Sequence, residues 1–143
     1  PWSNPSASSS SYGGNPLAAA AGLAAIEIIV KEDLVKNAER VGRVMLARLH
    51  AMKERFRCVG DVRGRGLLLG IDLVRDRTTK EPVDRAVARS LYQACLRRGL
   101  VAMTYAPTIR INPPLVIREE EALAGLAILE EALGAVVREH GLA

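Results

Sequence analysis

One segment of the chain would be apolar on every side if it folded as a helix. Residues 17–30, with the sequence LAAAAGLAAIEIIV, contain a single charged residue, Glu27. Asn15 is a favourable N-cap and Pro16 fits the first helical turn, so we predict that a helix begins there. It is shorter than the roughly 20 apolar residues of a membrane span. Because a helix without a polar face must be buried, we expect it to pack on a partner subunit or a larger domain, with a central position in a small bundle as the alternative.

Composition narrows the class of protein. The 143 residues are 49% hydrophobic and 25% charged, which is typical of a globular domain and excludes a disordered tail or a disulfide scaffold. Aromatic residues make up 3%, too few for a stacking surface that binds single-stranded nucleic acid. The net charge of +4 comes from arginines that alternate with acids along helix-like segments, which favours solvated helix faces. The start has no signal-peptide pattern, so a cytoplasmic location is expected; its first residue, Pro1, indicates processing or a piece of a longer protein.

Cysteine and histidine offer no metal site. Cys58 and Cys95 are far apart in the sequence and have no partner motif, so buried reduced thiols are expected. His50 and His140 lie in helix-like segments without a metal-ligand pattern around them. Neither a zinc site nor a Ser–His–Asp arrangement is therefore predicted.

The hydrophobic pattern predicts an α+β fold. Helical periodicity and its stop signals indicate three further helices, at residues 34–55, 83–98 and 119–140. Short apolar runs indicate three strands, at residues 67–74, 100–105 and 108–112. Glycines in GRGLLLG are interpreted as tight turns, since the segment lacks the spacing of a dinucleotide loop and the Gly-Lys of a phosphate loop. The order of elements predicts a short antiparallel sheet covered by helices on one face.

The last strand carries an arginine on one side. Ile109 and Ile111 should point to one face of the sheet, and Arg110 to the other. Pro113 and Pro114 end the strand and stiffen its exit.

Several stretches together resemble one family. SSSYGGNPLAAAAGLAAIEII is similar to the Gly-Gly-Asn-Pro-Leu segment of class III, fold type I, pyridoxal-phosphate enzymes. DVRGRGLLLGIDLV and TIRINPPLVIREEEALAGLAILEEAL resemble later segments of that family, where an Arg precedes Pro-Pro-Leu. The resemblance runs from Ser9 to Leu133. It implies that residues 1–32 are a loop and a dimer-facing helix of the large-domain region, and that residues 33–143 are the C-terminal small domain.

The resemblance also implies roles for three residues. Ser11, where the family usually has Thr, would contact the phosphate of pyridoxal 5'-phosphate bound mainly by the other subunit, and Tyr12 would line the same pocket. Arg110 would receive a substrate carboxylate, for which a guanidinium offers two parallel donors. The alternatives are that Ser11 belongs to a serine-rich loop and that Arg110 forms a surface salt bridge. The Schiff-base lysine of the family lies upstream, so no catalytic residue is expected in this chain, which should be inactive alone.

The expected function is therefore part of an aminotransferase. It would transfer an amino group between an amino acid or amine and a 2-oxo acid such as 2-oxoglutarate or pyruvate, as a homodimer or dimer of dimers, without nucleic-acid or membrane partners. A decarboxylase like dialkylglycine decarboxylase, or an aminomutase like the glutamate-semialdehyde enzyme, is possible on the same scaffold. A non-catalytic α+β dimerisation module is the alternative outside the family, and nucleic-acid binding has only the pI of about 9.5 in its favour.

Overall fold

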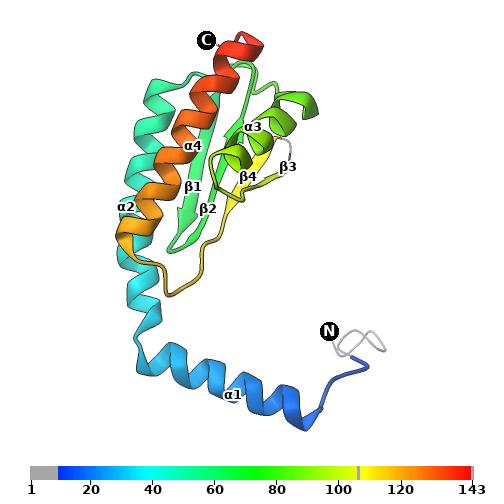
Figure 1. The fold of residues 1–143 in the computed structure, drawn as a ribbon, viewed down its shortest axis with the longest axis vertical. Coiled ribbons are helices and arrows are strands. Elements are labelled where there is room, and N and C mark those ends of the chain that lie inside the picture. Colours follow the sequence, from blue (N-terminus) through cyan, green and yellow to red (C-terminus); the bar gives the residue numbers. More distant parts are fainter. Residues whose placement is uncertain (1–9, 106, 143) are drawn as a thin grey trace. The chain divides into compact units, whose positions relative to one another are not determined.

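The computed structural model describes residues 10–105 and 107–142. In chain order it contains two helices, two strands, a helix, two strands and a helix (Figure 1). The chain divides into two compact units, Pro1–Leu34 and Val35–Ala143, and each is described by itself. Residues 1–9 of the loop expected before the apolar helix, and Ala106, expected to join the strands at 100–105 and 108–112, lie outside the described residues.

The first unit contains the apolar helix, α1 (Pro16–Lys31). Its start is as predicted, because Asn15 Oδ1 accepts hydrogen bonds from the backbone N–H groups of Leu17 and Ala18 at 2.9 and 3.2 Å. No residue of α1 is buried in this chain, although its side chains are mostly apolar. In the part of the chain that the structure describes, no helix is long and apolar enough to cross a membrane.

The second unit is an α+β domain with an antiparallel sheet of four strands, as the sequence predicts in class. The strands are β1 (Val59–Arg65), β2 (Leu68–Leu73), β3 (Met103–Tyr105) and β4 (Thr108–Ile111). Their order across the sheet is β1-β2-β4-β3, and every neighbouring pair is antiparallel. Strand β4 therefore lies inside the sheet, between β2 and the short edge strand β3.

Strand β1 is not among the strands predicted from the sequence, and β3 begins later than predicted. The glycines of GRGLLLG are predicted to form tight turns, but Gly64 lies within β1, Gly70 lies within β2, and only Gly66 lies in the β1–β2 turn. The predicted strand at 100–105 begins three residues later than expected, at Met103.

A close approach of two backbones explains the glycine at this turn. Gly66 has a φ of +54°, in the left-handed region that favours glycine. A Cβ placed on Gly42, in the helix that crosses the turn, would lie 2.0 Å from the Gly66 carbonyl oxygen. Glycine at position 42 permits the close approach, and glycine at position 66 permits the backbone conformation of the turn.

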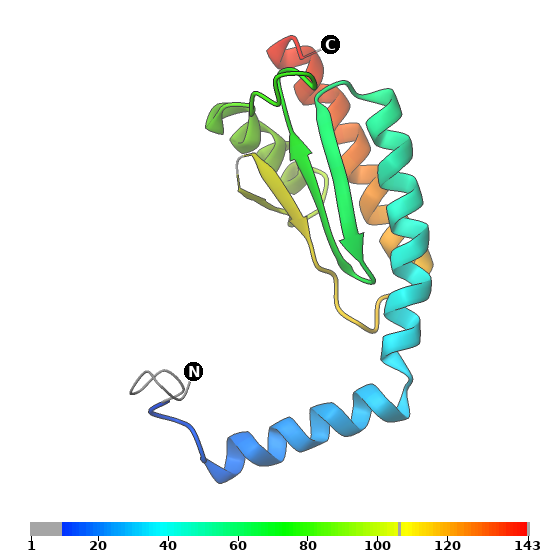
Figure 2. The same cartoon turned by 180° about the vertical axis from the view of Figure 1, so that it is seen from behind.

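Three helices cover one face of the sheet and leave the other open: α2 (Leu34–Arg55), α3 (Arg85–Arg97) and α4 (Glu119–His140). Figure 2 shows the open face, with the helices behind the sheet. Side chains from all three helices and from the inner face of the sheet form one core. Val41, Leu91, Leu133 and Ile71 are almost fully buried in it.

Helical spacing predicts buried stripes in the three helices: Leu34, Ala38, Val41, Met45, Leu49 and Met52 in the first; Val83, Ala86, Val87, Leu91, Ala94 and Cys95 in the second; and Leu123, Leu126, Ala127, Leu133 and Val137 in the third. The stripe of α2 is buried or half-buried as predicted, and the other two are partly wrong. In α3, Ala86 is exposed and Ala88 is buried instead. In α4, Leu123 and Ala127 are exposed, while Leu126 and Leu133 are buried as expected. Both helices contain apolar residues at more positions than the core uses, so periodicity alone did not select the inner face.

Candidate functional site

Arg110 projects from the open face of the sheet. It lies in β4, where Ile109 is buried beneath the helices and Arg110 is exposed on the opposite side, as the alternation predicts. Its neighbours across the sheet are Gly70 of β2 and Met103 of β3. Gly70 has no side chain, so the surface beside Arg110 is open on that side.

The chain that follows Arg110 is tied to α2. The Asn37 side-chain amide donates to the carbonyl oxygens of Leu115 and Ile117, at 2.7 and 3.1 Å. Arg40 forms an ion pair with Glu119 at 2.6 Å, at the start of α4. Together with the two prolines, these contacts fix the exit of β4 and hence the position of Arg110. The sequence analysis did not identify Asn37, because nothing in its helical context indicates a distant partner.

Arg110 has no partner among the described residues, whereas a second arginine on the same face is fully engaged. No ion pair or hydrogen bond joins the Arg110 side chain to another described group. Arg63 of β1, in contrast, donates to Asp61 at 2.8 Å and to Asp72 through both terminal nitrogens. Hydrogen bonding from Arg63 lowers the pKa of the Asp72 carboxyl, and Thr108 adds to that effect. The free guanidinium of Arg110, beside acidic side chains that Arg63 already pairs, can donate hydrogen bonds to a carboxylate from outside the chain.

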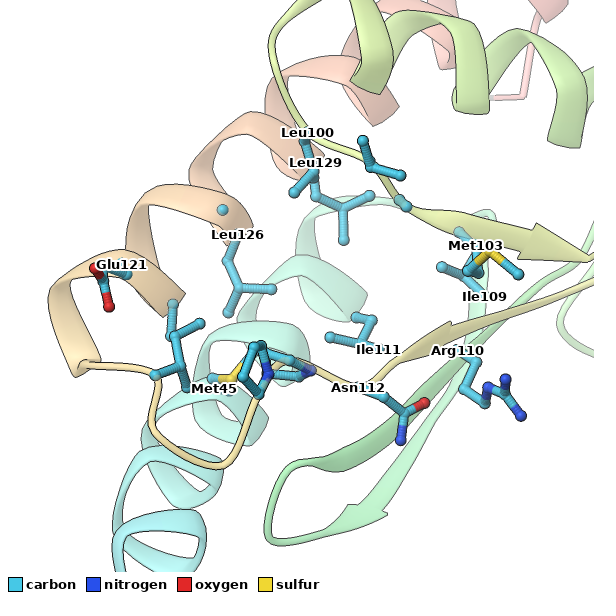
Figure 3. Close-up of a pocket in the computed structure, with 17 residues that line it drawn as sticks. Met45, Leu100, Met103, Ile109, Arg110, Ile111, Asn112, Glu121, Leu126 and Leu129 are labelled. Atoms are coloured by element: carbon cyan, nitrogen blue, oxygen red, sulfur yellow. The ribbon is translucent and has the colours of Figure 1, made fainter. Parts of the chain in front are cut away.

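A cavity of about 500 Å³ lies beside the same strand. Its lining is mostly apolar and comes from α2, α4, the strands β3 and β4, and the segments that flank these strands. Figure 3 shows Leu126, Leu129 and Met45 gathered around it, while Arg110 and Asn112 extend from β4 away from that cluster. Arg110 and Asn112 are themselves among the residues that line this cavity. The sequence analysis predicted no cavity.

The second group of predicted site residues lies in the loop before α1. Ser11 and Tyr12 are both exposed, and Tyr12 is 80% accessible. The loop is closed by hydrogen bonds from Gly13 N–H to the Ser10 carbonyl oxygen and from Asn15 N–H to that of Tyr12, each 3.2 Å. The Ser11 hydroxyl has no partner in the described part of the chain.

The start of α1 is not itself an open anion site. Pro16 has no N–H, and the N–H groups of Leu17 and Ala18 are already bound by Asn15. The N–H groups of Tyr12, Gly13 and Asn15 are bound within the loop, so the donors that remain there for an anion are the Ser11 hydroxyl and the backbone N–H groups of Ser11 and Gly14. A phosphate fits this donor set, because hydroxyl and backbone N–H donors next to glycine are typical of phosphate-binding loops. Ser11 and Arg110 lie in different compact units of the chain.

The two cysteines and two histidines do not form a reactive or metal-binding site among the described residues. Cys58 and Cys95 are buried and free, as expected. Burial raises the pKa of both thiols, that of Cys95 to about 11, so neither is an activated nucleophile. His140 contacts the Ser90 hydroxyl at 3.0 Å between α4 and α3, and His50 is exposed. Within the described residues, no three His, Cys, Asp or Glu side chains are grouped to hold a metal ion.

Comparison with known proteins shows which protein family the sequence matches. Residues 2–133 match the family model described as aminotransferase class-III. The leucine/methionine racemase of Thermococcus litoralis is 43% identical over 123 residues, which are 86% of this chain and 28% of that protein. The mitochondrial alanine–glyoxylate aminotransferase 2 of Homo sapiens is 34% identical over 125 residues, covering 85% of this chain and 24% of the relative. The chain thus spans less than a third of the relatives' length.

The fold itself is shared with solved transaminases. An amine transaminase from an uncultivated Pseudomonas species, solved in a PLP-bound form, superimposes with a TM-score of 0.79 at 35% identity. The match covers 91% of this chain and 29% of the transaminase.

Proposed function

This chain belongs to the class-III aminotransferases, and on that premise we propose that it is the C-terminal part of a pyridoxal-phosphate-dependent transaminase. The reaction would move an amino group between an amino acid or amine and a 2-oxo acid such as 2-oxoglutarate or pyruvate. The observation that carries this proposal is Arg110, an exposed guanidinium without a partner in the described chain, on a strand whose exit is fixed. Such a group binds a carboxylate with two parallel hydrogen bonds.

Each predicted residue has a binding task in this proposal. Arg110 holds the carboxylate of the oxo acid or amino acid, which orients the substrate without taking part in bond making. Ser11 donates its hydroxyl to the cofactor phosphate, and Tyr12 covers the same group in the completed site. When bound, pyridoxal phosphate supplies the electron-accepting ring that amino-group transfer requires.

The rest of the enzyme belongs to the same proposal. The lysine that carries the cofactor would lie in the part of the enzyme that this chain does not cover, so the chain alone is inactive. The exposed apolar helix α1 would be covered by the large domain and by a partner subunit in a homodimer or dimer of dimers. In the domain scheme that accompanies this assignment, residues 1–32 belong to that large-domain region and residues 33–143 form the small domain. Two free, buried cysteines agree with a reducing compartment such as the cytoplasm.

The test compares two arginine variants of the full-length enzyme. Arg110→Met should raise KM for a 2-oxo acid about tenfold or more, with a much smaller effect on an amine donor that has no carboxylate. Arg65→Met is the matched control, because Arg65 is also exposed and without a partner among the described residues, but lies next to the hairpin turn. Equal KM values for the oxo acid in wild type and Arg110→Met would refute the role of Arg110. A full-length enzyme without the visible absorption of a bound cofactor would refute the class of reaction.

A racemase is the second candidate, because a leucine/methionine racemase is among the similar proteins. A single-enantiomer assay separates the two activities. Incubation of the full-length enzyme with L-leucine or L-alanine alone should leave the enantiomer unchanged if a 2-oxo acid is required. Formation of the D-enantiomer without any oxo acid would favour racemisation, and release of carbon dioxide would favour a decarboxylase on the same scaffold.

A further inference from the structure

Two arginines flank one carboxylate on the open face of the sheet. Asp72 lies in β2, and its direct neighbours across the sheet are Asp61 in β1 and Thr108 in β4. Two residues further along those strands, Arg63 and Arg110 occupy matching diagonal positions on either side of Asp72. Diagonal neighbours are about 7–8 Å apart, within reach of an arginine side chain. Either guanidinium could therefore bind Asp72.

In this structure Arg63 binds Asp72, and Thr108 forms a further hydrogen bond to the same carboxylate. The Arg63 Nη2 atom donates to Asp72 Oδ1 at 3.1 Å, and its Nη1 atom donates to Asp72 Oδ2. The Thr108 hydroxyl donates to the same Oδ1 atom. With both oxygens of Asp72 engaged from the β1 side and by Thr108, Arg110 is left without an ion pair among the described residues.

The charges around Asp72 explain why this choice matters. Asp61 and Asp72 face each other directly, an arrangement that is unfavourable unless a cation lies between them. Arg63 is that cation. In addition, the Lys53 Nζ atom of α2 lies 3.9 Å from Asp61 Oδ1. Without Arg63, two facing carboxylates would attract the next cation. Gly70, between Arg63 and Arg110, leaves the path of the Arg110 side chain open.

We propose that Arg63 is a positioning residue that occupies Asp72 and thereby keeps Arg110 free for a substrate carboxylate. Loss of Arg63 lets Arg110 turn onto Asp72, and the carboxylate site is then neutralised from within the protein. This inference deepens the proposed function and rests on it for the substrate, but the exchange of partners at Asp72 can be measured without any reaction.

Other cations near Asp72 must be included in the test. Arg77 and Lys80, in the segment after β2, line a cavity of about 300 Å³ together with Asp61, Asp72 and Thr108. Arg77 is held by the carbonyl oxygens of Arg57, Phe56 and Lys53, at the end of α2. Lys80 is the group that could take the place of Arg63 instead of Arg110.

The test is a set of carboxyl titrations by NMR on the 143-residue chain, after amide spectra have established that each variant is folded. Arg110→Met alone should leave the pKa of Asp72 low. Arg63→Met should raise it only in part, because Arg110 takes over, and the Arg63→Met/Arg110→Met double variant should raise it further, because only the Thr108 hydrogen bond is left to lower it. Arg65→Met is the control and should change nothing. If Arg63→Met and the double variant give the same Asp72 pKa, then Arg110 does not replace Arg63 and the proposal is wrong. If, in that case, the Asp72 pKa is lower in Arg63→Met than in Arg63→Met/Lys80→Met, then Lys80 is the group that replaces Arg63.

Steady-state kinetics of the full-length enzyme test the functional half. Arg63→Met should raise KM for the 2-oxo acid about tenfold while kcat falls much less, and adding Asp72→Asn should restore the KM. A KM that Asp72→Asn does not restore would contradict the proposal. If Arg110→Met itself leaves KM unchanged, the proposed function fails, whereas the NMR titrations still decide whether Arg110 and Arg63 compete for Asp72.

Discussion

The two faces of the small sheet are built from the same strands and have opposite tasks. On the inner face, Val62, Ile71 and Ile109 lie side by side across three strands and are buried under the helices. On the outer face, one residue further along the same strands, Arg63, Gly70 and Arg110 form a parallel row. The difference arises only from the two-residue alternation of a strand.

The two faces contribute differently to folding: the inner face stabilises the fold, and the outer face carries the candidate site with little effect on stability. The inner row loses apolar surface to the core, which is the main source of folding free energy. The outer row carries charges that are largely solvated, and such ion pairs contribute little to stability. Substitutions on the outer face should therefore change binding with little effect on folding, and those on the inner face should do the reverse.

The largest expected effect comes from a pair of neighbouring substitutions in β4. Ile109→Ala should lower the free energy of unfolding by about 2–5 kcal/mol, because it removes buried methyl groups and leaves a cavity. Arg110→Ala should change it by less than about 0.5 kcal/mol, since the side chain is exposed and has no partner among the described residues. Urea unfolding followed by circular dichroism measures both. A loss above about 2 kcal/mol in Arg110→Ala would mean that the outer face also holds the fold.

A smaller effect is expected where α2 meets the turn of the hairpin. Gly42→Ala should cost about 1–3 kcal/mol, because the added Cβ would lie 2.0 Å from the backbone oxygen of Gly66 and one of the two backbones must move. Thermal unfolding of the variant and of wild type gives the difference.

Gly125→Ala is the matched control for that substitution. Gly125 is also inside a helix, but the nearest atom to an added Cβ is Leu100 Cδ1 at 3.7 Å, an ordinary contact. The change should therefore raise stability by about 0.5–1 kcal/mol through helix propensity. Equal effects in the two variants would show that the close approach at Gly42 does not constrain the helix.

These examples also show what the sequence could predict. The alternation Thr-Ile-Arg-Ile is unambiguous, so the faces of β4 and the exposure of Arg110 were predictable from these four residues. Strand β1 was not, because its glycines are needed for contacts that other elements make: a Cβ on Gly60 would meet Val74, and one on Gly64 would meet Leu69. Local composition therefore indicated a loop where tertiary packing holds a strand.

The site was predictable only one residue at a time. Arg110, Ser11 and Tyr12 came from short patterns and a family resemblance. Their assigned roles remain predictions. The partnership of Arg63 with Asp72 depends on the register between β1 and β2, which no local pattern specifies once β1 itself is missed.

The smallest expected effect concerns the ion pairs of the outer face and depends on pH. The folded-state pKa of Asp72 is lowered, chiefly by Arg63, so the unfolded chain binds the proton first and stability increases with pH. The contribution is complete above about pH 5 and is lost as pH falls through the ordinary carboxyl pKa of 3.8 toward the lower folded value. Asp72→Asn should therefore cost about 1 kcal/mol or less at pH 7, and its deficit should disappear in strong acid.

Urea unfolding at pH 7 and at successively lower pH measures that deficit. Glu27→Gln is the control, because Glu27 is exposed on α1 and forms no ion pair with a described residue; it should change the free energy of unfolding by less than about 0.5 kcal/mol. A deficit in Asp72→Asn that stays constant down to strong acid would show that Asp72 acts through its hydrogen-bond geometry and not through its charge. A deficit above about 2 kcal/mol at pH 7 would place Asp72 with the inner face in its energetic role, and the separation between the two faces would then fail at this residue.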